Sequence, residues 1–249
     1  MPENLPQKTL RAAVLALAAL ALLGPIIAGL WHSAGAALGH MPALGQTGWG
    51  LAPLHEMLAQ PGLATALRLT LVTGFAATLF SLILALALAA AITHGPLRIV
   101  ARLLAPFLAI PHAALAVGLA FVLAPSGWVA RALAPALGWL RPPDLATVND
   151  AMGAALTLGL VIKETPFLLL AILAGLTQIP LRAHIAAGQS LGYGLGAIWV
   201  KIIAPQLWPL IRLPVFVVLI YGLSVVDMAL ILGPSNPPTA AVLVARMFS

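Results

Sequence analysis

Between Ala151 and Thr177 the chain reads AMGAALTLGLVIKETPFLLLAILAGLT, an apolar run interrupted near its middle by Lys163 and Glu164. A helix of about 20 predominantly apolar residues crosses the roughly 30 Å hydrocarbon core of a bilayer, so this stretch is long enough to span one. A charged side chain at the centre of such a span costs on the order of 2.5–3.5 kcal/mol. The stretch therefore predicts a membrane-spanning helix whose two charges are kept for a structural or functional reason.

The composition extends this interpretation to the whole chain. Of its 249 residues, 62% are hydrophobic and 7% are charged, whereas soluble domains have about 45–50% and about 25%. This composition excludes a disordered chain, which needs high charge and low hydrophobicity. It also excludes a soluble globule, because so few charges cannot cover the surface of a chain of this size. The absence of cysteine excludes disulfides, a thiolate nucleophile and Cys-based metal or iron–sulfur sites.

The hydropathy pattern predicts an all-α integral membrane protein, a helical bundle in one domain over residues 1–249. Five spans are expected, at about 10–30, 66–93, 103–124, 151–177 and 207–232. The net charge of +6 indicates membrane topology rather than nucleic-acid binding, because cytoplasmic loops collect Lys and Arg. The segments before span one, between spans two and three and between spans four and five would be cytoplasmic, and so would the N-terminus. They carry Lys8, Arg11, Arg98, Arg102, Arg182 and Lys201.

The segment 178–205, between spans four and five, is the most informative loop. Pro180 suits the first turn of a helix and Gly192 suits a helix C-terminal cap. Between them the small residues predict a short helix at about 181–191 with a smooth face. The segment is too polar to insert and too short to fold alone, so we expect it to dock a partner at the membrane surface.

This loop resembles that of the binding-protein-dependent ABC importer permeases, the MetI-like type. Their signature is Glu-Ala-Ala, three residues, Gly, nine residues, Ile, one residue and Leu-Pro. Laid on this chain it begins at Ala186, with matches at Ala187, Gly192, Ile202 and Pro205 and departures at Ala186, Gly188 and Ala204. Within the family, the chain is similar to thiamine-type permeases over Lys163 to Phe167, Leu191 to Gly194 and Asp227 to Pro238.

The resemblance implies a translocation path for a small solute, thiamine or a related compound, in a bacterial inner membrane. It implies ATP-binding cassette ATPase subunits, a second permease domain or half, membrane lipid and a solute-binding protein as partners. The loop residues expected to couple to the ATPase are Ala186, Ala187, Gly188, Gly192, Ile202 and Pro205. The chain holds no Gly-rich phosphate loop of its own, so it is not expected to hydrolyse ATP. No cofactor is expected in this chain, and the partner ATPase would use ATP and Mg²⁺. Family members usually have a further span, so we expect either a fragment, such as the N-terminal half of a fused double permease, or a naturally shortened protein.

Lys163, Glu164 and Asp227 are the candidate pathway or gating residues. Adjacent helix residues point about 100° apart, so Lys163 and Glu164 cannot share one face, and each needs its own partner or reaches a water-filled cavity. The alternative is that they form structural ion pairs. Asp227 could meet a cationic substrate, pair with Lys163 or bond to freed backbone, and His112 is expected to be a hydrogen-bonded packing residue.

Two other functions stay open at this stage. A proton-coupled secondary transporter would use the same charges as a relay, and a membrane enzyme would need a convergent set of reactive groups that the scattered charges do not offer. The histidines of the first outer loop, His32, His40 and His55, match no metal-ligand spacing, and no metal site is expected.

Overall fold

The computed structural model describes residues 5–94 and 106–247, and these divide into two compact units, Met1–Leu63 and Ala64–Ser249. The first unit holds α1 (Leu5–Ala37), the 3₁₀ turn η1 (Pro42–Leu44) and α2 (Ala52–Leu58). Its loop is ordered by His40, whose ring stacks on Trp49 at 4.6 Å and whose Nδ1 donates to the carbonyl of Thr47 at 3.0 Å. This histidine therefore serves packing.

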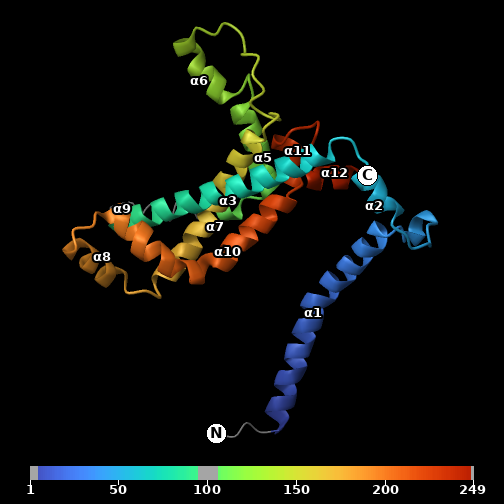
Figure 1. The fold of residues 1–249 in the computed structure, drawn as a ribbon, viewed down its shortest axis with the longest axis horizontal. Coiled ribbons are helices and arrows are strands. Elements are labelled where there is room, and N and C mark those ends of the chain that lie inside the picture. The colour runs from blue at the N-terminus through green and yellow to red at the C-terminus, as the bar shows by residue number, and fades with distance from the viewer. Residues whose placement is uncertain (1–4, 95–105, 248–249) are drawn as a thin grey trace. The chain divides into compact units, whose positions relative to one another are not determined.

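The second unit is a helical bundle followed by short helices (Figure 1). Its elements are α3 (Leu63–His94), a helical turn at 106–109, α5 (His112–Leu123), α6 (Trp128–Leu137), α7 (Ala154–Leu176), α8 (Leu181–Ser190), α9 (Leu195–Ile198), the π-helix η2 (Trp199–Ile203), α10 (Ala204–Ser224), α11 (Asp227–Leu232) and α12 (Ala240–Met247).

The predicted all-helical membrane architecture is confirmed. The described residues contain no strand, and five helical segments are long and apolar enough to cross a membrane. They are Thr9–Ala37, Leu63–Thr93, His112–Leu137, Ala154–Leu176 and Leu195–Ser224.

Two predicted spans differ from the structure in their bounds. The third was expected at 103–124, of which 103–105 lie outside the described residues; the structure starts α5 at His112 and adds α6 where a loop was expected. The fifth was expected at 207–232, but the helical segment begins at Leu195, and α10 ends at Ser224 because the next residue has an extended backbone. Hydropathy misses such breaks because the flanking residues are equally apolar.

The helix α7 is the centre of the second unit and contacts α5, α10 and α11. Its two halves belong to separate core clusters. One cluster gathers on the α8 side and includes Leu168, Leu169, Ile172, Ile198 and Leu207; the other gathers around Leu156, Leu160, Ala116, Met228 and Leu232. Lys163 and Glu164 lie on α7 between the two clusters.

A glycine pair lets α3 approach α10. A Cβ built on Gly74 would lie 2.7 Å from the side chain of Leu223, and one built on Gly222 would lie 3.3 Å from the Gly74 backbone. Small residues at membrane helix crossings allow such backbone proximity. The crossing fixes α3 against the bundle at this level.

Candidate functional site

A break in the chain beside the middle of α7 organises the candidate site. The helical turn 106–109 ends at Ile110, and Pro111 then precedes α5. Proline has no N–H and cannot continue the helical hydrogen-bond ladder, so the carbonyls of the preceding turn lose their usual partners. A membrane interior cannot supply water to these carbonyls.

Lys163 replaces the missing donors. Its Nζ donates to the carbonyls of Phe107 at 2.8 Å, Leu108 at 3.2 Å and Ile110 at 2.6 Å. An ammonium has three donors, and here all three are used. The positive charge also lies where the carbonyl end of a helix is partially negative. The residue is 5% exposed, so the cation is taken up by the backbone of the break.

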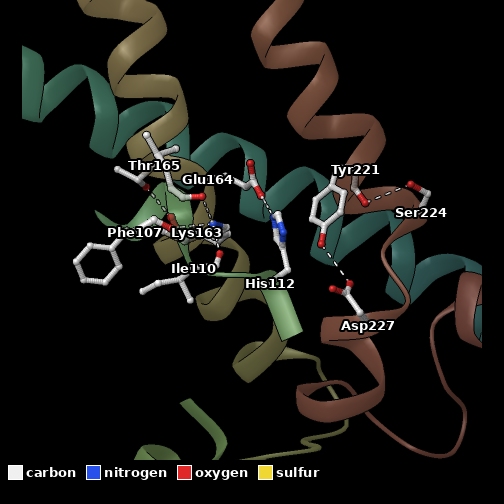
Figure 2. A network of polar contacts seen from close by, with 11 residues as sticks. Phe107, Ile110, His112, Lys163, Glu164, Thr165, Tyr221, Ser224 and Asp227 are labelled. Atoms are coloured by element: carbon white, nitrogen blue, oxygen red, sulfur yellow. Dashed lines mark hydrogen bonds and ion pairs between the residues drawn. The ribbon is translucent and has the colours of Figure 1, made fainter. Parts of the chain in front are cut away.

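Glu164 holds the other side of the break. Its Oε1 lies 3.1 Å from Nε2 of His112, the first residue of α5. A carboxylate near a helix N-terminus is favourably placed. Together Lys163 and Glu164 bridge the end of one helical segment and the start of the next (Figure 2). The prediction that each charge has its own partner is confirmed.

A second contact extends the site from α5 toward α10 and α11. The ring of His112 packs against that of Tyr221, with centroids 4.5 Å apart, and Tyr221 Oη donates to Asp227 Oδ1 at 3.2 Å. Figure 2 shows the two side chains pointing toward one another across the end of α10. Asp227 is exposed and opens α11 rather than lying inside a continuous fifth span. Its partner is thus Tyr221, and the pairing with Lys163 that was one sequence-based option is not formed.

The coupling segment folds as the loop pattern predicts. Pro180 is the N-cap of α8, which runs Leu181–Ser190, and Gly192 follows with a positive φ of 80°. The amide of Tyr193 donates to the Gly188 carbonyl at 3.0 Å and closes the helix end. A left-handed residue that ends a helix in this way is favoured by glycine.

The predicted coupling residues do not all share one surface. Ala186 and Ala187 are exposed, whereas Gly188 is buried. A Cβ on Gly188 would lie 2.6 Å from Ile198 Cγ1, so this glycine lets α8 rest on α9. Ile202 lies in the π-helix η2 and Pro205 at the start of α10. Gly188 therefore connects α8 to the fifth span through Ile198, while the two alanines are exposed.

Sequence reasoning missed the contact between His112 and Glu164 and the role of the Phe107–Ile110 carbonyls. Pro111 indicates the break in the helix. The side chains that contact the break lie far away in the sequence, so the sequence does not indicate which ones they are. Among the described residues, no group of three His, Asp or Glu side chains could hold a metal ion.

The fold and the site define a multi-span helical membrane protein with an interrupted span beside a buried charge pair and a short helix at one end. In the comparisons with known proteins, no protein-family model matches. The chain is 35% identical over 205 residues, 81% of its length, to the inner membrane ABC transporter permease protein YnjC of Escherichia coli (strain K12).

The chain is therefore similar to an ABC transporter permease over most of its length, and its five apolar helices fit such a protein. It spans 37% of the length of that relative. The relationship and the apolar helices support a multi-pass protein of the inner membrane. The name of that relative specifies no solute.

Proposed function

We propose that this chain is a permease subunit of an ATP-driven importer and forms part of the translocation path for a small solute. The relationship to a permease supports the class. The single observation that carries the proposal is α8, a capped helix at one end of the bundle that presents Ala186 and Ala187 outward and rests on α9 through Gly188. A partner ATPase would supply ATP hydrolysis, with its Mg²⁺, and a solute-binding protein would deliver the solute.

The proposed coupling runs from α8 into the fifth span. A displacement of α8 is passed to Ile198 through the close contact at Gly188. From there α9, η2 and α10 form a continuous helical segment, Leu195–Ser224. Protein interiors are close-packed, so a push at one end of such a segment is transmitted rather than absorbed.

Charge substitutions on α8 test the docking proposal. Ala186→Arg and Ala187→Arg add a bulky cation to the outward face and should reduce both ATPase co-purification and solute-stimulated ATP hydrolysis in the reconstituted complex. Gln189→Arg adds the same charge on the flank of the same helix and is the matched control. Undiminished co-purification and coupling in both alanine variants would refute docking through this face.

We propose an orientation in which the N-terminus and α8 are cytoplasmic. The positive charges of the loops support it. The native chain has no cysteine, so a single Ala186→Cys variant can be labelled without background. It should react with an impermeant maleimide in inverted vesicles and not in intact spheroplasts. Labelling from outside would contradict the orientation.

For the solute we propose a small cation, thiamine or a related compound. The sequence resemblance supports the compound, and the exposed carboxylate of Asp227 beside the Tyr221 ring supports the charge. Asp227→Asn should lower uptake of the cation and spare the uptake of an uncharged analogue, whereas Asp144→Asn, in an exposed loop, should change neither. Equal loss for both solutes would reject charge recognition by Asp227.

The contact between two titratable groups, Glu164 and His112, favours one alternative, a proton-coupled transporter. The two functions differ in energy source. Uptake into vesicles that persists with a hydrolysis-deficient ATPase and follows an imposed proton gradient would support the alternative. Uptake that requires ATP hydrolysis and ignores the gradient would support the importer.

A further inference from the structure

The helix α6 leaves a large apolar face without a partner in the described part of the chain. Trp128 is 78% exposed, and Val129, Leu133 and Leu137 are between 44% and 54% exposed. Since a helix advances by about 100° per residue, Val129, Leu133 and Leu137 lie along one stripe of α6. Figure 1 shows α6 extending away from the packed helices of the second unit.

The opposite face of α6 carries the charged residue of the helix, which bonds to the turn before it. Arg131 lies about half a turn of the wheel from the apolar stripe, and its Nε donates to the Ser126 carbonyl at 2.9 Å. Arg131, Trp139 and Arg141 line a pocket of about 220 Å³ between α6 and the loop that follows it. From Pro125 to Arg141 the sequence holds two Arg, two Trp and no acidic residue.

The place of α6 is set by the span before it. α5 is the first part of the apolar segment His112–Leu137 and ends at Leu123, whose carbonyl accepts a hydrogen bond from Thr147, just before α7. That is the end of α7 opposite α8. A Cβ on Gly127 would lie 2.4 Å from the Phe121 carbonyl, so the chain turns tightly against the last turn of α5. α6 therefore begins near the level at which α7 begins, and α7 is by itself long enough to cross a membrane.

We propose that α6 is an interfacial helix that lies in the lipid surface on the side of the membrane opposite α8. Its Val129–Leu133–Leu137 stripe would be buried among the upper acyl chains, and Arg131 and Arg141 would lie at the level of the lipid phosphates. Amphipathic helices with Arg on one face and Trp and Leu on the other sink about 5–10 Å into this region, and Trp128 and Trp139 have the rings that settle there. A protein partner would instead have to cover the Val129–Leu133–Leu137 stripe at the level of the membrane surface, where lipid is already present.

Site-directed spin labelling of the full chain tests this in phosphatidylethanolamine–phosphatidylglycerol vesicles. Single cysteines replace Val129, Leu133, Leu137 and, as the control, Arg141; all four are exposed, so the labels do not enter a packed core. Labels on the stripe should be relaxed strongly by oxygen and weakly by a water-soluble nickel chelate. The label at 141 should show the reverse.

Each other outcome overturns the proposal. Strong nickel relaxation at all four positions means that α6 stands in water. Nickel relaxation at 129, 133 and 137 that disappears only when a solute-binding protein or second permease is added means that the stripe docks a protein. The measurement does not depend on transport. The interfacial position of α6 can therefore be refuted while the proposed importer function stands, and the importer function can be refuted while the position of α6 stands.

Discussion

Replacing Lys163 by Met tests whether the ammonium holds the break before α5. Methionine keeps most of the volume and removes the charge and all three donors, which leaves the carbonyls of Phe107, Leu108 and Ile110 without their bonds at 2.6–3.2 Å. Hydrogen bonds to charged groups contribute about 1.5–3 kcal/mol each. Because a single ammonium, itself removed from water, makes all three hydrogen bonds, its total contribution is smaller than three times this value. Leaving a buried acceptor without its donor costs about 1–3 kcal/mol, so we expect Lys163→Met to be destabilised by at least that amount.

The matched control is Lys201→Met. Its ammonium lies 5.4 Å from the centroid of the Tyr193 ring and the side chain is exposed, where a cation–π contact contributes about 0.5–1 kcal/mol. Equilibrium unfolding in mixed micelles, followed by circular dichroism, measures both variants. If Lys163→Met is no more destabilised than Lys201→Met, the reasoning about the carbonyl cluster is wrong.

Three further outcomes are expected. Glu164→Gln can still hydrogen-bond to the first residue of α5, so it should alter the rate of transport or coupled ATP hydrolysis more than the unfolding midpoint; normal specific activity with lowered stability would assign it a structural role. Gly188→Val should lower stability by about 1–3 kcal/mol through overpacking and weaken coupling, because its Cβ would meet α9 at 2.6 Å; Ala183→Val, on the exposed side of α8, should not. Gly74→Leu should disrupt the crossing of α3 with α10 and reduce the folded yield, whereas Gly118→Leu, which has nothing within 4 Å, should fold like the parent chain.

The sequence was sufficient for the elements that depend on local pattern. Long apolar runs predict spans because each residue contributes its own transfer free energy. Pro180 and Gly192 predict the two ends of α8 because helix caps act on neighbouring residues. The need for separate partners of Lys163 and Glu164 also followed from helix geometry alone.

The identity of those partners could not be predicted in the same way. The carbonyls that meet Lys163 lie 53 to 56 residues earlier in the chain, and backbone groups leave no trace in the amino-acid sequence. The end of α10 at Ser224 was also hidden, since the residues around it are as apolar as the span itself. Gly188 fell within the family motif, but only the contact with Ile198 distinguishes a packing role from a docking one.

The π-helix at Trp199–Ile203 gives the spacing of the loop motif a geometric meaning. A π turn arises when one extra residue is accommodated within an α-helix. Deleting one residue there would restore the ordinary winding and leave the length of the span almost unchanged. The same deletion in an α-wound part of the segment would instead rotate α8 and α9 by about 100° relative to α10. Gly188 and Ile198 both lie before the wide turn and stay in contact in either case. The π turn therefore lets the interval between Gly192 and Ile202 hold one more residue without rotating α8 and α9 against α10.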